Sequence, residues 1–230
     1  MDDFRTFLQE ALAGSLPGRA AQQRMMPRYP DGSVRHFPIP DNARQTAVAV
    51  VISSPTCPAV LLTLRSQFLR HHRGQISFPG GRIERGEHAI EAALRELQEE
   101  VGISSSTVSV LGCLSPLYTP PSNSAITPVV MACNGSVALC LDVCEVEEAF
   151  WVPLHQLDGT AIEQVWELPY GTMIVPHWQV HPRVPLWGAT AIILAELLEL
   201  YRCWLSRQAV QEEQAAGALH RAGREDQPER

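Results

Sequence analysis

Residues 81–103 read Gly81-Arg-Ile-Glu-Arg-Gly-Glu87-His-Ala-Ile-Glu-Ala-Ala-Leu-Arg95-Glu96-Leu-Gln-Glu99-Glu100-Val-Gly102-Ile103. Apolar residues recur here every three or four positions, which predicts a helix over about residues 88–101 that stops at Gly102. Its packing stripe would consist of Ile90, Leu94, Leu97 and Val101. At about 100° per residue, Glu96, Glu99 and Glu100 lie on an adjoining side. Three carboxylates therefore share one side of a short helix that follows a Gly-Gly loop.

These three glutamates indicate a site for a divalent cation. Glu96 is three residues from Glu99 and four from Glu100, so like charges face one another at a cost of roughly a few tenths of a kcal/mol per pair. A hard cation would reverse that sign, since carboxylate oxygens suit Mg²⁺ or Mn²⁺. Mg²⁺ is usually held by a few carboxylates, waters and substrate phosphates, so the expected substrate carries phosphate. Taken alone, the same residues also fit a solvated acidic helix face.

The surroundings favour the site, because Phe78-Pro79-Gly80-Gly81 lets backbone come close to a ligand. The spacing is Gly81, five residues, Glu87, seven residues, then Arg95-Glu96-Leu97-x-Glu99-Glu100-x-Gly102-Ile103. It resembles the full Nudix box, with every fixed position filled. The resemblance implies hydrolysis of a nucleoside diphosphate linked to another group. It also implies an α+β fold, an α/β/α sandwich with a mixed β-sheet between helices, and a requirement for Mg²⁺ or Mn²⁺.

The resemblance also implies roles for individual residues. Glu96, Glu99 and Glu100 would be the main metal ligands, and Glu87 a further or water-linked one. Arg95 would orient a glutamate by ion pairing, since a guanidinium group can hold a carboxylate bidentately. Glu99, Glu100 and Arg95 are thus the expected catalytic residues. The cations would draw charge off the diphosphate and lower the pKa of a bound water that attacks phosphorus.

A second signal lies upstream, in Leu61-Leu62-Thr63-Leu64-Arg65-Ser66, then Arg70, Gly74 and Phe78-Pro79-Gly80-Gly81. It resembles the coenzyme A pyrophosphatase signature and departs from it only at Arg65, where the signature has a second Thr. The implied reaction splits coenzyme A or an acyl derivative into 3′,5′-adenosine bisphosphate and a 4′-phosphopantetheine. Arg70, Gly80 and Gly81 are the expected substrate-binding residues, with Arg65 beside them.

The departure at Arg65 keeps another Nudix substrate open, namely ADP-ribose, NADH or a dinucleotide. A more distant alternative is a non-catalytic Nudix module that binds a nucleotide or a protein partner. The loss of a metal glutamate would mark such a module, and none is missing here.

Composition agrees with one enzyme-sized domain acting on a small molecule. The chain has 230 residues, 45% of them hydrophobic, and a net charge of −7, which argues against general nucleic-acid binding. Positive charge gathers locally, in Arg65, Arg70, His71, His72 and Arg73. Six cysteines show no zinc-like spacing and are expected to be reduced thiols. The acidic start lacks a secretory pattern, so a cytoplasmic location is expected.

The chain divides into an N-terminal helix (2–13) and wrapping arm over 1–42, a hydrolase domain over 43–207, and a polar, disordered tail over 208–230. Strands are predicted near 46–52, 59–64, 108–117, 126–133, 147–152 and 172–180. Residues 188–205 are apolar enough that a membrane-spanning helix must be considered. Glu196, Glu199 and Arg202 argue against it and favour a second packing helix, with a candidate homodimer surface.

An acidic cluster at residues 145–148 precedes one predicted strand. Nudix relatives often place a further carboxylate here, so Glu148 is a candidate distant ligand or general base. A solvated turn acid fits the same residue equally well, and the identity of the base stays open.

Overall fold

The computed structural model describes residues 3–34, 37–53, 57–69, 72–169 and 171–225, with side chains in the last helix up to residue 215. The strands of the main sheet are β1 (Arg44–Ile52), β2 (Ala59–Arg65), β3 (Ile76–Ser77), β4 (Gly80–Arg82), β5 (Val108–Cys113), β6 (Leu117–Thr119), β7 (Ser124–Cys133) and β8 (Val146–Pro153). The helices are α1 (Phe4–Leu12), α2 (Gly18–Gln22), α3 (Ala89–Val101), α4 (Leu154–Leu157) and α5 (Gly188–Glu225), with 3₁₀ turns η1 (Gln23–Met25), η2 (Ser105–Thr107) and η3 (Pro120–Ser122).

The sheet is mixed, as expected. Its strands follow the order β3-β2-β1-β7-β5, with β4 paired to β1, β6 to β7 and β8 to β2. β1 and β7 run parallel, whereas the other pairs are antiparallel. A separate hairpin of β9 (Ile162–Leu168) and β10 (Gly171–His177) lies outside this sheet. β9 was not predicted, because its residues are mostly exposed and lack an alternating apolar face.

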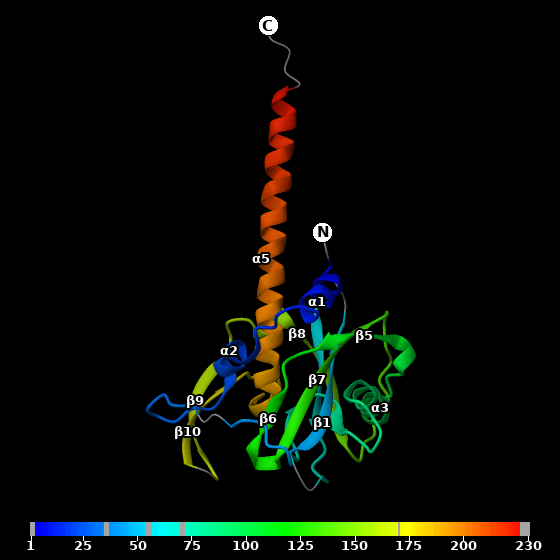
Figure 1. The fold of residues 1–230 in the computed structure, drawn as a ribbon, viewed down its shortest axis with the longest axis vertical. Coiled ribbons are helices and arrows are strands. Elements are labelled where there is room, and N and C mark those ends of the chain that lie inside the picture. Colours follow the sequence, from blue (N-terminus) through cyan, green and yellow to red (C-terminus); the bar gives the residue numbers. More distant parts are fainter. Residues whose placement is uncertain (1–2, 35–36, 54–56, 70–71, 170, 226–230) are drawn as a thin grey trace.

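Alternation along β1 builds a core on each face of the sheet. Ala47, Ala49 and Val51 face α3, while Val50 and Ile52 face the core formed with α1 and α5. α3 and α5 therefore cover opposite faces of the sheet, which gives the predicted α/β/α sandwich (Figure 1).

The buried side of α3 is rotated from the predicted stripe. Leu97 and Val101 are buried, but Ile90 is 40% exposed and Leu94 is only half-buried. Ala92, Ala93 and Glu100 are buried instead. Alanines of α3 and β1 belong to one buried cluster between helix and sheet.

α5 is longer than predicted. It begins at Gly188, and its backbone is helical to Glu225, through most of the range from residue 208 where a disordered tail was predicted. Gln, Glu, Ala and Arg dominate residues 207–216, and all have high helix propensity. The helix projects beyond the body of the molecule (Figure 1). In the part of the chain that the structure describes, no helix is long and apolar enough to cross a membrane.

The N-terminal arm is more regular than expected after α1, because α2 and η1 lie within it. A buried carboxylate on α5 holds the arm in place. Glu196 accepts hydrogen bonds from the Gly18 amide at 3.0 Å, from Gln22 Nε2 at 3.0 Å and from Ser115 Oγ at 2.7 Å. The acid within the apolar helix thus has a structural explanation.

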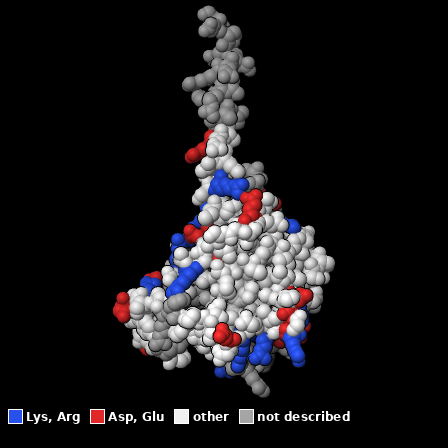
Figure 2. All heavy atoms as spheres, viewed as in Figure 1, with Lys and Arg blue, Asp and Glu red and all other residues white. Residues whose placement is uncertain are grey.

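Charge on the surface is mixed. On the face shown in Figure 2, basic side chains lie beside acidic ones and do not form a continuous basic surface.

Candidate active site

The Gly80-Gly81 pair lies where β4 meets β1 and α3. A Cβ atom at Gly80 would be 2.4 Å from the Ala47 carbonyl oxygen, so a side chain there would separate β4 from β1. A Cβ atom at Gly81 would be 2.3 Å from Glu96 Oε1. One glycine therefore permits the strand pairing, and the other leaves room for a carboxylate of α3.

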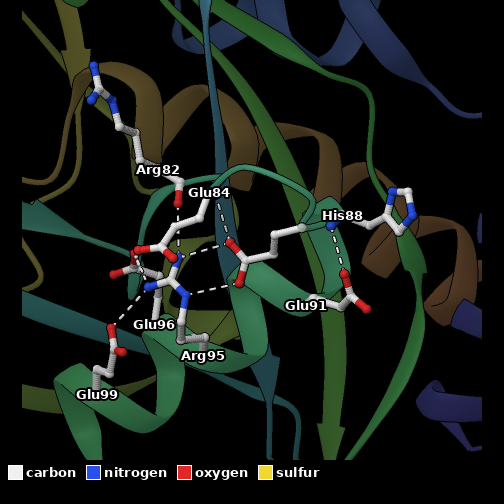
Figure 3. Close-up of polar contacts among 8 residues, drawn as sticks. Arg82, Glu84, His88, Glu91, Arg95, Glu96 and Glu99 are labelled. Atoms are coloured by element: carbon white, nitrogen blue, oxygen red, sulfur yellow. Dashed lines mark hydrogen bonds and ion pairs between the residues drawn. The ribbon is translucent and has the colours of Figure 1, made fainter.

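Arg95 stands at the centre of the acidic cluster (Figure 3). Its Nε donates to Glu87 at 2.9 Å, and its Nη1 donates to Glu96 at 2.8 Å and to Glu99 at 3.0 Å. Its Nη2 donates to the Arg82 carbonyl at 2.9 Å and to the second oxygen of Glu87 at 3.1 Å. All five guanidinium N–H donors are used, so Arg95 orients three carboxylates rather than one.

Burial and hydrogen bonding shift the pKa values of the carboxylates in different directions. The hydrogen bond from Arg95 lowers the pKa of Glu87, and the Glu84 amide acts in the same direction. Burial raises the pKa of Glu96 in spite of Arg95, and the charges of Glu99 and Glu145 add to that rise. Glu99 itself is 59% exposed. The cluster thus runs from an exposed acid to a deeply buried one.

Glu100 is the most deeply buried acid of this cluster. Its side chain is 2% exposed, and neither carboxylate oxygen has a hydrogen-bond partner among the described residues. Burial raises the pKa of Glu100 to about 8, and the charges of Glu96 and Glu145 also raise this pKa. The charge of Arg65 and the Gly80 amide lower it, although the amide is not placed to form a hydrogen bond. An ion pair with Arg65, 3.5 Å from Nη1 to Oε1, is the contact that remains.

Glu145 is the acid that the sequence analysis did not single out. Its charge raises the pKa of both Glu96 and Glu100, which places it beside the cluster. Its carbonyl oxygen accepts a hydrogen bond from the Ser66 amide at 2.8 Å, which ties the turn before β8 to the end of β2. The sequence signal was present, since Glu145 belongs to the same acidic run as Glu148.

Glu148 lies in a different network. Its carboxylate contacts His181 Nε2 at 3.1 Å and forms an ion pair with Arg183. Hydrogen bonding to His181 lowers the pKa of Glu148, as does the charge of Arg183. Arg183 also binds Glu147, at 2.8 Å. Successive side chains of a regular strand point to opposite faces, but an irregularity in the β2–β8 register at this point lets both glutamates reach one arginine.

The donor set suits a hard divalent cation in chemistry. All the candidate ligands are carboxylates, and the buried oxygens of Glu100 lack a hydrogen-bond donor. The present rotamers do not form a finished metal site, because among the described residues no group of three or more His, Cys, Asp or Glu side chains is placed to hold a metal ion. Arg95 holds Glu87, Glu96 and Glu99 instead. Cation binding therefore requires these side chains to move.

The family comparison agrees with this geometry. A family model described as NUDIX domain matches residues 43–171. The chain belongs to the Nudix family. Nudix enzymes are pyrophosphohydrolases that act on nucleoside diphosphate derivatives and generally use divalent metal ions. The predicted family and enzyme class are thus confirmed.

Named relatives extend the Nudix match. The protein named Uncharacterized Nudix hydrolase NudL of Pectobacterium atrosepticum is 38% identical over 160 residues, which cover 67% of this chain and 81% of the relative. NudL of Photorhabdus laumondii is 35% identical over 169 residues, covering 69% and 86%. The crystal structure of the Nudix hydrolase RenU from M. smegmatis matches with a TM-score of 0.50 and 18% identity, over 77% of this chain and 94% of that one, and shows the fold.

The structure describes three of the four expected substrate-binding residues of the Nudix domain. Gly80 and Gly81 border the carboxylates, and Arg65 contacts Glu100. Arg70 lies outside the described residues. Leu61, Leu62 and Thr63 are fully buried, and Thr63 Oγ1 donates to the Ser77 carbonyl at 3.1 Å. This part of the upstream signature therefore links β2 to β3 within the core.

Proposed function

We propose that this Nudix enzyme is a Mg²⁺- or Mn²⁺-dependent diphosphatase of coenzyme A or acyl-coenzyme A, which releases 3′,5′-adenosine bisphosphate and (acyl-)4′-phosphopantetheine. The observation that carries the chemistry is Glu100, a buried carboxylate without hydrogen bonds, next to Glu96 and the Gly80-Gly81 loop. The upstream signature, which runs from Leu61 to Gly81, supports the substrate.

The proposed roles follow from position. Glu96, Glu99 and Glu100 hold the cation, Glu87 is a further ligand, and Arg95 sets their rotamers through its five donors. We add Glu145, whose charge acts on both Glu96 and Glu100. The cation, when bound, neutralises the diphosphate and activates a water for attack on phosphorus.

The substrate side of the site is formed by glycine backbone and arginine. Gly80 and Gly81 border the carboxylates with backbone alone, because side chains there would meet β1 and Glu96, and we place the diphosphate beside this backbone. Arg65 and Arg70 supply positive charge in a chain of net charge −7. Phosphate groups are recognised by guanidinium forks, which supports these residues as the anion-binding pair.

Parallel assays test the substrate. Purified protein with Mg²⁺ or Mn²⁺ is incubated with coenzyme A, an acyl ester of it, ADP-ribose and NADH. We expect the highest kcat/KM for coenzyme A or its ester. Incubation in ¹⁸O-water, followed by mass analysis of the products, reports which phosphorus is attacked.

A preference for ADP-ribose by tenfold or more would overturn the coenzyme A assignment. It would favour the second candidate function, hydrolysis of another nucleoside diphosphate derivative. The specific observation behind that candidate is Arg65, because an arginine stands where the signature has Thr.

A further inference from the structure

Arg65 and Glu100 form an unusual pair. The distance of 3.5 Å between Nη1 and Oε1 exceeds the 2.7–2.9 Å of a charge-assisted hydrogen bond. The arginine side chain is 19% exposed, and the carboxylate is 2% exposed. Arg65 makes no side-chain hydrogen bond to the residues that the structure describes, and this contact is its ion pair there. The two side chains therefore lie within ion-pair distance but are not joined by a short hydrogen bond.

The backbone of Arg65 is held firmly. Its amide donates to the Gln75 carbonyl at 3.0 Å, and its own carbonyl accepts from the Gly74 amide at 2.9 Å. The next residue, Ser66, donates to Glu145. Arg65 also pairs with β8 at the register irregularity. The Cα position beside the cluster is therefore fixed, so that only the side chain is free to change partner.

Arg95 does not take the place of Arg65 as the partner of Glu100. Its five donors are all used by Glu87, Glu96, Glu99 and the Arg82 carbonyl. A buried, ionised carboxylate without an opposite charge is strongly destabilising. In the cation-free protein, Arg65 is thus the counter-ion that the described residues offer to Glu100 whenever this carboxyl is ionised.

We propose that Arg65 is an exchangeable counter-ion. It neutralises Glu100 until a divalent cation binds, is then displaced from that carboxylate, and offers its free guanidinium donors to the diphosphate of the substrate. The displacement follows from charge, because a divalent cation and a guanidinium group within a few ångströms of one carboxylate repel each other in a poorly screened site. The substrate half of this inference rests on the proposed function; the cation half does not. Arg65 is a positioning residue in the first state and a substrate ligand in the second.

The first test measures cation affinity without substrate. Mn²⁺ is titrated by calorimetry into the full chain as wild type, Arg65→Gln and Arg65→Lys. We expect Arg65→Gln to bind Mn²⁺ at least threefold more tightly, because the competing charge is gone, and Arg65→Lys to stay within twofold of wild type. Arg73→Gln is the matched control: it removes the same charge from an exposed position in the segment that joins β2 to β3, and its affinity should change less than twofold.

Two further measurements separate exchange from a purely structural role. In EDTA, Arg65→Gln should unfold at a lower temperature than wild type, and saturating Mn²⁺ should raise its Tm by more than it raises that of wild type. In a Glu100→Gln background, Arg65→Gln should no longer tighten Mn²⁺ binding. Unchanged or weaker Mn²⁺ binding by Arg65→Gln, an equal gain in Arg73→Gln, or a gain that persists with Glu100→Gln would each overturn the proposal.

Kinetics test the substrate half. At saturating Mn²⁺, Arg65→Gln should raise KM at least tenfold and change kcat less than threefold; an unchanged KM would overturn this half. The calorimetric result needs no turnover. Absence of diphosphatase activity on every substrate would therefore contradict the proposed function, while the calorimetric outcome would still decide the exchange between Arg65 and the cation.

Discussion

At the scale of single residues, Glu100 makes stability depend on pH. Its pKa is about 8 in the folded protein, against an ordinary value of 4.5, so the folded state holds the proton more tightly than the unfolded state. This contribution to stability is fully present below the ordinary pKa and is lost as pH rises through about 8. We expect the metal-free protein to lose about 2–4 kcal/mol of unfolding free energy from this group between pH 5 and 9.

Urea unfolding in EDTA over this pH range checks the prediction. The control is Glu100→Gln, which does not titrate and should flatten the profile. A wild-type profile identical to that of Glu100→Gln would contradict the assigned pKa.

The same substitution tests catalysis. Glu100→Gln removes the charge of one ligand oxygen with little change of volume, so turnover with Mg²⁺ should fall at least a hundredfold. The metal-free Tm at neutral pH should not fall, since a carboxyl with a pKa of about 8 is already mostly protonated there and Gln is a neutral group of similar volume. Steady-state kinetics and thermal unfolding give both values. Unchanged turnover would remove Glu100 from the site.

Gly81→Ala tests the space occupied by Glu96. The new Cβ atom would be 2.3 Å from Oε1 of Glu96, so this carboxylate must leave its place beside Arg95. We expect kcat/KM to fall at least tenfold. Gly14→Ala is the control, because its Cβ atom would have nothing nearer than 3.6 Å, and it should retain activity. Wild-type kcat/KM in Gly81→Ala would show that Glu96 is not needed where it stands.

At the scale of elements, we assign different functions to two acids at β8. Glu145 lies in the turn before β8 and acts on Glu96 and Glu100, whereas Glu148 lies within β8 and binds His181 and Arg183. Glu145→Gln should therefore lower kcat/KM at least tenfold with little effect on Tm. Glu148→Gln should change kcat/KM less than threefold and cost about 0.5–1 kcal/mol, since the pair is about half exposed.

Kinetics and urea unfolding of both variants decide between the two assignments. The reverse pattern, with Glu148→Gln inactive and Glu145→Gln active, would make Glu148 the catalytic acid.

At the scale of the whole molecule, the two ends of the chain contribute differently. Phe4 and Leu8 of α1 are fully buried, and Phe4 packs against the rings of Tyr201 and Trp204 at 5.6 and 5.2 Å. Burying two such side chains is worth roughly 3–6 kcal/mol in total. Removal of residues 1–14 should thus lower the unfolding free energy by at least about 3 kcal/mol.

Removal of residues 212–230 is the matched comparison. α5 projects from the body (Figure 1), and residues 212–215 are exposed. Activity and the unfolding free energy should therefore stay close to those of the full chain. Unfolding curves of both truncations measure these changes. Equal losses of unfolding free energy in the two truncations would contradict this account of the fold.

Local pattern predicted much of this molecule. The run of Thr46–Ile52 and the stretch 89–101 became β1 and α3 because their periodicities are those of a strand and a helix. β9 was missed and α5 was taken as too short, because an exposed hairpin strand and a polar helix carry no apolar periodicity. The domain boundaries and the roles of the site residues stay predictions.

The sequence by itself determined the family, the sandwich and the acids of α3, since helix spacing alone puts Glu96, Glu99 and Glu100 together. Only the tertiary structure decided which acid is buried, that Arg95 holds three carboxylates at once, and that Arg65 and Glu145 meet the cluster from β2 and the turn before β8. The physical reason is that burial and charge coupling depend on distances between segments far apart in the chain, and local spacing holds no information on these distances.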